Sequence, residues 1–271
     1  MPNILVSLSS LYQSIVSLPW RARGARFAKQ WQDLVIAQHG QAEPIGRNSD
    51  AAANPMRDYF DRHTEGPGVQ KWLHYFEIYH RHLAKFVGRS PVIVEVGIYS
   101  GGSLPMWRHY FGRGCQVHGL DIDPECVLYN GPETAIHIGD QADRAMWQRF
   151  REAVPQVDIL IDDGAHTPEA QVVTLEEMLP HLQPGGVYIC EDVHHVRNRF
   201  AEFAYSLCNG LNEGEIDPGT NVDTIARTPF QGAIHSLHIY PLLVLIEKRE
   251  YSESIFSAPL RGTQWRPSKT A

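Results

Sequence analysis

From Pro91 onward the chain repeats one pattern, in which a short apolar run is followed by a segment with helical spacing. The apolar runs that we interpret as strands cover residues 92–96, 116–120, 134–138, 157–161 and 187–190. The helical segments cover residues 104–111, 142–153, 168–182 and 198–212. Repeated strand–helix units with short apolar strands predict a doubly wound, Rossmann-like α/β sheet that is mostly parallel.

Two further apolar runs, residues 233–239 and 242–247, close this part of the chain, with Tyr240-Pro241 between them. No long helix fits between these runs, so the pair has to be antiparallel. The pattern therefore predicts a seven-stranded α/β sheet with an antiparallel C-terminal strand. The polar segment from Gly210 to Gln231 reads as a loop near an active site.

The first third of the chain follows a different pattern. Residues 1–38 look helical, residues 39–57 read as a loop, and His63–Gly68 forms a further break. Aromatic and aliphatic residues from Trp72 to Phe86 then recur at spacings of three and four, which predicts a helix whose stripe is mostly core. We assign residues 1–88 to an N-terminal helical extension and lid, and residues 89–271 to the α/β domain.

Composition narrows the class of protein. The 271 residues carry a formal charge of −7, so we expect no nucleic-acid partner. Four scattered cysteines without Cys-x-x-Cys spacing fit a reducing cytoplasm. The first twenty residues lack a basic n-region, and no apolar stretch reaches about 18–20 residues, so we predict a cytoplasmic protein with no membrane span. The N-terminal helix either has a solvated basic face or is an interfacial or oligomer-forming helix, and we expect a homo-oligomer.

Two carboxylate pairs stand where apolar runs end, Asp162-Asp163 and Glu191-Asp192. Both pairs should emerge at the carboxyl edge of one sheet, where ligands bind in open α/β folds. Clustered carboxylates repel one another unless protons or a cation neutralise them, so this feature points to a divalent metal. The residues alone leave open which aspartate of the first pair is a ligand. Asp162 is expected to face the cofactor or cap a helix.

A cofactor site is predicted at the same edge. The turn after the first strand, from Glu95 to Ser103, is rich in glycine and serine, which lets a ligand approach the backbone closely. It lacks the Gly-x-Gly-x-x-Gly spacing of dinucleotide sites and any basic residue that could meet phosphate. Asp121 ends the second strand and could accept hydrogen bonds from ribose hydroxyls, although a helix cap is the alternative role. This acid-rich, phosphate-free pattern matches S-adenosylmethionine.

On these motifs the chain resembles the class I S-adenosylmethionine-dependent methyltransferases. More narrowly, it resembles the metal-dependent sugar O-methyltransferases of macrolide tailoring and of mycobacterial methylated mannose polysaccharides. The segments that carry the resemblance are 162–166, 191–194, 234–240 and 244–248. One departure is visible, because Thr64-Glu65-Gly66 stands where many relatives have Thr-Asp-Lys before the helix that precedes the first strand.

The resemblance implies roles for single residues. His166 would be the general base, and Asp163, Glu191 and Asp192 would bind Mg²⁺. His194 and His195 are weaker candidates for substrate contacts. The candidate cofactor-binding residues are Glu95, Gly97, Ser100, Gly101, Ser103, Asp121, Asp123, Asp140, Gln141 and Asp162.

The predicted function is a Mg²⁺-dependent methyl transfer from S-adenosylmethionine to a sugar hydroxyl of a glycoside, oligosaccharide or polysaccharide, with mannosides among the expected acceptors. Alternatives on the same scaffold are a catechol or phenol O-methyltransferase and another metal-dependent tailoring enzyme, such as a hydroxylase. A carboxylate-rich set argues against the iron that a hydroxylase needs. A nucleoside-binding module without catalysis would leave the metal acids and His166 without a purpose.

Overall fold

The computed structural model describes residues 19, 21–37, 53–194, 199–213, 224–259 and 261–262. The chain divides into two compact units, Met1–Ala52 and Ala53–Ala271. In the first unit, residues 21–37 are helical, as predicted, and the other residues of the predicted helical segment 1–38, apart from residue 19, lie outside the described residues. The second unit contains the sheet and the cavity described below. Among the described residues, no helix has both the length and the apolar character to cross a bilayer.

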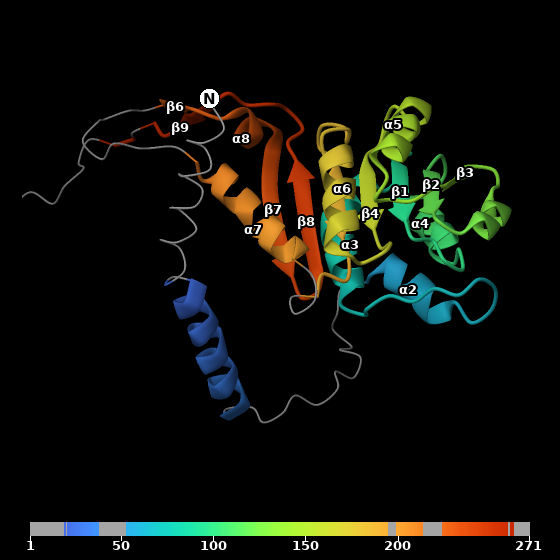
Figure 1. The fold of residues 1–271 in the computed structure, drawn as a ribbon, viewed down its shortest axis with the longest axis horizontal. Helices are drawn as coiled ribbons and strands as arrows, with labels where there is room; N and C mark the ends of the chain where they lie inside the picture. Colours follow the sequence, from blue (N-terminus) through green and yellow to red (C-terminus); the bar gives the residue numbers. More distant parts are fainter. Residues whose placement is uncertain are drawn as a thin grey trace, which may run out of the picture. The chain divides into compact units, whose positions relative to one another are not determined.

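The second unit is built on a seven-stranded sheet with the order β3-β2-β1-β4-β5-β8-β7 (Figure 1). Strands β1 to β5 pair in parallel, and β8 is antiparallel to both β5 and β7. The predicted sheet of seven mostly parallel strands is therefore confirmed. The strands are β1 (Val92–Val96), β2 (Gln116–Asp121), β3 (Thr134–Ile138), β4 (Ile159–Asp162), β5 (Val187–Cys190), β7 (Ile234–Tyr240) and β8 (Leu243–Lys248).

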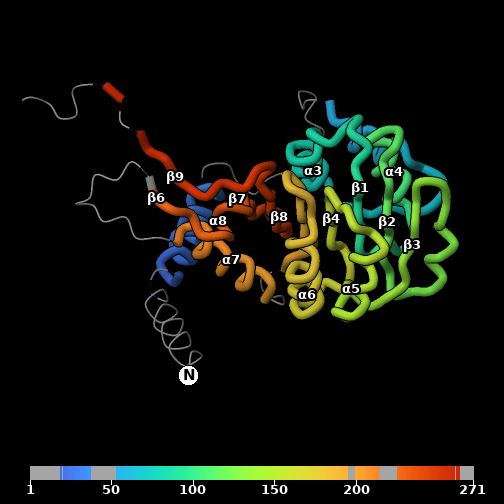
Figure 2. Tube along the Cα trace, turned by 90° about the horizontal axis from the view of Figure 1, so that it is seen from above, coloured from blue at the N-terminus to red at the C-terminus, as the bar shows by residue number. Residues whose placement is uncertain are grey.

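Helices cover both faces of this sheet, with α3 and α4 on one side and α5 and α6 on the other (Figure 2). Each face has its own apolar core, which Trp107 of α4 and Trp147 of α5 fill from opposite sides. The helices are α2 (Pro55–Arg62), α3 (Tyr75–Leu83), α4 (Ser103–Phe111), α5 (Arg144–Ala153), α6 (Pro168–Met178), α7 (Phe200–Leu211) and α8 (Pro229–Ala233), and the 3₁₀ helices are η1 (Ala84–Phe86) and η2 (Pro124–Tyr129).

Helix α2 begins inside the segment 39–57, where a loop was predicted. The Asn54 side chain accepts hydrogen bonds from the backbone N–H groups of Met56 and Arg57, and Pro55 occupies the first turn. Asn-Pro is therefore a helix start here, because an N-cap followed by proline satisfies a helix as well as a turn. Met56 is fully buried, which anchors α2 in the core.

The predicted loop between Gly210 and Gln231 is also wrong in part. Strand β6 (Thr224–Ala226) pairs with β9 (Ile255–Ser257), and α8 begins at Pro229. Thr228 and Gln231 form a reciprocal capping box at the start of α8. A five-residue helix with a strong cap leaves little periodic signal in the sequence, since its apolar face has no repeat.

The aromatic stripe before the first strand is core only from Tyr75 onward. Tyr75, Phe76 and Tyr79 are buried, whereas Trp72 and Leu73 are exposed because they lie in the turn that precedes α3. Residues of α2 and α3 share one core with α4 and the sheet. The division at residue 88 stays a prediction, and the compact unit of the structure begins at Ala53.

Candidate active site

A cavity of about 590 Å³ opens at the carboxyl ends of the parallel strands. Its walls come from the segments that follow β1, β2, β3, β4 and β5 and from residues 68–72 before α3. Strand β1 lies between β2 and β4, so the strand order runs outward from β1 in both directions. Open α/β sheets bind ligands at such a switch point in the strand order. The predicted site residues that line the cavity are Glu95, Gly97, Ser100, Ser103, Asp121, Asp140, Gln141, Asp163, His166, Glu191 and Asp192.

Asp121, at the end of β2, holds two backbone segments at the cavity wall. Its Oδ2 accepts from the backbone N–H of Tyr99 at 3.0 Å, and its Oδ1 accepts from that of Asp123 at 3.0 Å. Each carboxylate oxygen has a second lone pair for a ligand hydroxyl. Asp123 itself caps η2 through Glu125 and does not line the cavity.

Contacts within the chain explain why the turn after β1 contains glycines. Gly97 has a φ of 80°, and a Cβ placed there would overlap the backbone carbonyl oxygen of Asp163. At Gly101 a Cβ would meet the ring of Tyr129, and this glycine does not line the cavity. Gly97 therefore lets the turns after β1 and β4 touch directly, while Gly101 leaves room for the Tyr129 ring.

Gln141 and Asp162 fix the loop that carries His166. The Gln141 Nε2 donates to Asp162 Oδ1 at 2.9 Å, and its Oε1 accepts from the backbone N–H of Ala165 at 2.6 Å. Asp162 is fully buried, and burial raises its pKa to about 6. It lies beneath the cavity rather than on its wall, where it supports the loop.

Lys71 is the functional candidate that sequence reasoning missed. Its buried Nζ lies 2.6 Å from Asp163 Oδ2, 3.1 Å from Glu191 Oε2 and 3.4 Å from Glu95 Oε1. Burial alone lowers the pKa of Lys71, but the three carboxylates outweigh it and hold the pKa well above its usual range. The Lys71 ammonium therefore supplies positive charge among these three carboxylates.

Glu191 is held from two sides. Besides Lys71, the buried Tyr79 hydroxyl donates to Glu191 Oε1. Burial raises the pKa of Glu191, while Lys71 and Tyr79 oppose that rise. Glu95 accepts a hydrogen bond from Ser103 Oγ at 2.5 Å, which uses its second oxygen.

His166 faces the two remaining carboxylates. Its Nε2 lies 3.8 Å from Asp163 Oδ1 and 3.7 Å from Asp192 Oδ2, and its side chain is about one-third exposed at the cavity. His166 and Asp192 both have a φ of 52°, a backbone conformation that costs non-glycine residues energy. Trp72 Nε1 and the Tyr75 hydroxyl donate to Asp192 Oδ1, at 2.9 and 3.1 Å, which aims Asp192 at His166.

Two of the three predicted Mg²⁺ ligands, Asp163 and Asp192, lie close enough together to bind one cation. Ligating atoms of Asp163, His166 and Asp192 lie within 4.8 Å of one another, and carboxylate oxygens are the ligands that Mg²⁺ prefers. Glu191, the third predicted ligand, instead accepts hydrogen bonds from Lys71 and Tyr79. His194 is exposed and outside the cavity lining, and His195 lies outside the described residues.

Comparison with known proteins agrees with this geometry. Residues 94–193, which run from β1 to just past β5, match a family model described as a methyltransferase domain. The fold resembles the MycE methyltransferase of mycinamycin biosynthesis, solved with Mg and SAH, with a TM-score of 0.60 and 23% identity over 88% of this chain and 61% of that one. The chain therefore carries a methyltransferase domain, as the sequence predicted.

The relatives within that class are sugar O-methyltransferases. The chain is 32% identical over 206 residues to the 8-demethyl-8-alpha-L-rhamnosyl tetracenomycin-C 2'-O-methyltransferase of Streptomyces olivaceus, which covers 68% of this chain and 53% of that protein. It is 31% identical over 215 residues to the demethylmacrocin O-methyltransferase of Streptomyces fradiae, over 68% and 51%. The chain thus spans about half the length of the curated relatives it matches, and the predicted resemblance to this group is confirmed.

Proposed function

We propose that the chain is an S-adenosylmethionine-dependent O-methyltransferase whose acceptor is a sugar hydroxyl of a glycoside. The observation that carries the proposal is the position of His166, which faces the cavity between Asp163 and Asp192 while Asp121 stands on the same cavity wall. A proton acceptor and a hydroxyl-binding acid in one cavity are what methyl transfer to an alcohol requires. The names of the relatives support the acceptor class.

The cofactor would lie along the β1, β2 and β3 ends. S-adenosylmethionine supplies the electrophilic methyl group when bound. Asp121 would bind the ribose hydroxyls, and Asp140 with Gln141 would border the adenine. The absence of lysine or arginine from the β1 turn, residues 97–102, fits a cofactor without phosphate.

Asp163 and Asp192 would hold Mg²⁺, which when bound polarises and orients a sugar hydroxyl. Glu191 would join them once Lys71 releases it, because the amine now occupies the space among the carboxylates. His166 Nε2 would accept the proton of the acceptor hydroxyl. The flanking carboxylates of Asp163 and Asp192 would stabilise the resulting imidazolium.

The test is methyl transfer from isotope-labelled S-adenosylmethionine to a panel of rhamnosides, mannosides and catechols, with Mg²⁺ or with excess chelator. We expect labelled product from a glycoside only when Mg²⁺ is present. Transfer to catechols alone would replace the sugar by an aromatic acceptor, and full activity in chelator would refute the metal role. The mannoside arm tests the narrower acceptor that the sequence resemblance implies.

We also propose that the protein works in the cytoplasm on a small-molecule or oligosaccharide acceptor rather than a nucleic acid, and that copies of the chain associate. Cys115, Cys126, Cys190 and Cys208 are all free thiols, which supports a reducing compartment. The charge of −7 disfavours nucleic acid. Exposed apolar residues on the helix 21–37 support association.

A further inference from the structure

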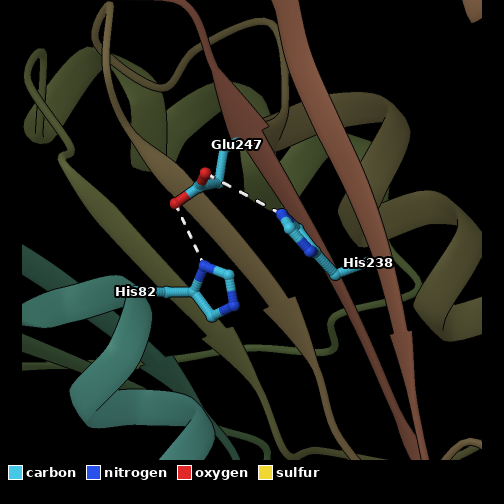
Figure 3. A group of neighbouring side chains, drawn as sticks. All are labelled: His82, His238 and Glu247. Carbon is cyan, nitrogen blue, oxygen red and sulfur yellow. Dashed lines mark hydrogen bonds and ion pairs between the residues drawn. The ribbon is translucent and has the colours of Figure 1, made fainter.

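A second cluster of metal-binding side chains lies outside the cavity, between α3 and the β7–β8 hairpin (Figure 3). It consists of His82 of α3, His238 of β7 and Glu247 of β8. His238 and Glu247 belong to the segments 234–240 and 244–248, which the proposed reaction does not use. Glu247 pairs with Val187 at the start of β5, so it lies at the end of the sheet away from the cavity.

We propose that His82, His238 and Glu247 form a binding site for a divalent transition metal of the zinc class. His82 Nδ1 lies 3.2 Å from Glu247 Oε1, and His238 Nε2 lies 3.9 Å from Glu247 Oε2. Tetrahedral Zn²⁺ with bonds of about 2.0–2.1 Å places its ligand atoms roughly 3.3–3.4 Å apart. Each imidazole faces a different oxygen of Glu247, and one ligand atom from each of the three residues lies within 4.8 Å of the others. Side-chain rotations that bring these atoms closer together would complete the site.

The surroundings orient the ligands as metal sites require. His82 Nε2 contacts the Tyr240 hydroxyl at 2.8 Å, which leaves Nδ1 directed at Glu247. Ser236 Oγ lies 2.9 Å from His238 Nε2 and donates to Glu247 Oε2 at 3.3 Å, so an ion bound to these two atoms would replace both contacts. A hydrogen bond to the second ring nitrogen of a ligating histidine fixes its orientation, and Tyr240 supplies that bond to His82.

Burial and charge suit an ion that enters from one side. His82 is buried, while the His238 side chain is 33% exposed and gives access from solvent. Neutral imidazoles and an ionised carboxylate are the forms in which these residues bind metals, so an ion would replace the proton that His82 shares with Glu247.

Lys85 is the competing cation. Its Nζ lies 3.5 Å from Glu247 Oε1, and its side chain is 37% exposed, so it can swing into solvent when an ion arrives. Two imidazoles and one carboxylate favour zinc, iron(II), cobalt or nickel over magnesium, which prefers oxygen ligands. The site is therefore chemically distinct from the carboxylates of the cavity.

A metal here would act on the active site through α3. This helix also carries Tyr75 and Tyr79, whose hydroxyls contact Asp192 and Glu191. Joining His82 to the hairpin would fix the far end of the same helix. The role that follows is structural, since the cluster does not touch the cavity.

The experiment is a Co²⁺ titration of the chelator-stripped full chain, followed by visible absorption, because Co²⁺ in a site of nitrogen ligands with low coordination gives intense visible bands. We expect one equivalent to give such a band in wild type and in Asp163→Asn, and a loss of at least tenfold in Co²⁺ affinity in His238→Ala and Glu247→Gln. His235→Ala changes an exposed histidine of the same strand and should keep the band. Excess Mg²⁺ should leave it unchanged.

Zn²⁺ should also raise the melting temperature of wild type but not that of His238→Ala. The His238 side chain is partly exposed, so we expect this variant to fold. A band that disappears in Asp163→Asn but persists in His238→Ala would overturn the proposal, as would the absence of any band in wild type. These outcomes are independent of methyl transfer, so a failure here leaves the proposed function untouched.

Discussion

At the scale of single residues, one lysine sets the electrostatics of the site. Lys71 Nζ is within 3.4 Å of oxygens from Glu95, Asp163 and Glu191. Removing one partner of a buried ionic group leaves uncompensated charge, which costs about 3–5 kcal/mol. The lysine and a divalent cation are therefore alternative ways to neutralise the same carboxylates.

Lys71→Met should lower the free energy of unfolding by about 3–5 kcal/mol in the absence of Mg²⁺. Added Mg²⁺ should restore more stability to this variant than to wild type, because the cation replaces the missing charge. Urea unfolding with and without Mg²⁺ measures both effects. Lys29→Met, on the exposed N-terminal helix, is the matched control, and an unchanged Mg²⁺-free stability of Lys71→Met would contradict the account.

His166→Ala should reduce turnover about 10²- to 10⁴-fold while S-adenosylmethionine binding stays at the wild-type level. In the proposed mechanism only proton removal depends on the imidazole, whereas Asp121 and the β1 turn remain in place. Steady-state kinetics and calorimetry separate the two quantities. His235→Ala is the control, and wild-type turnover in His166→Ala would eliminate this residue as the base.

The acid pairs were predictable at the sheet edge because each stands where an apolar strand ends, and His166 was singled out three residues beyond Asp163. Lys71 could not be found in this way, since its partners lie up to 120 residues further along the chain. The predicted convergence of Asp163, Glu191 and Asp192 assumed an ion among them. In the structure Glu191 instead turns to Lys71 and Tyr79, a choice that only three-dimensional packing decides.

At the scale of elements, α3 connects the core to the site. Its buried face fills the space between α2, α4 and the sheet, and two of its tyrosines end on the acids after β5. The strands were predictable because buried parallel strands are nearly continuous apolar runs. Helices α2 and α8 were not, because each is short and begins with residues that also favour turns.

Tyr79→Phe should destabilise the fold by about 1–3 kcal/mol, because it leaves the buried Glu191 without one hydrogen-bond donor while it keeps the ring. Urea unfolding at neutral pH measures the change. Tyr251→Phe removes a hydroxyl from a side chain that is 80% exposed and should change stability little. Equal stability of the Tyr79 and Tyr251 variants would show that α3 does not support Glu191 energetically.

At the scale of the whole molecule, the N-terminal helix is unlike the rest of the described chain. Phe27, Trp31, Leu34 and Val35 fall at helical spacing on one face, and all are exposed. Such a stripe buries apolar area only when something packs on it. The fold class was predictable from the repeated strand–helix pattern, whereas the partner of this helix and the identity of the acceptor leave no periodic trace in one sequence.

Trp31→Glu should shift the full chain toward lower mass in light scattering, because a charge in the apolar stripe opposes association of copies. Gln30→Glu adds the same charge to an exposed polar position of the same helix and should leave the mass unchanged. A wild-type chain that is monomeric at all concentrations would rule out the proposed association. Melting of the α/β unit should be the same in both variants.

Gly97 joins the turn after β1 to the turn after β4 by direct backbone contact. Because no side chain fits between it and the carbonyl oxygen of Asp163, the turn after β1 and the loop that bears His166 are in contact main chain to main chain. Under the proposed function, the distance from the bound methyl donor to His166 would then depend on backbone contacts at this point. Substitutions in the outer wall of the cavity would change acceptor preference without changing that distance.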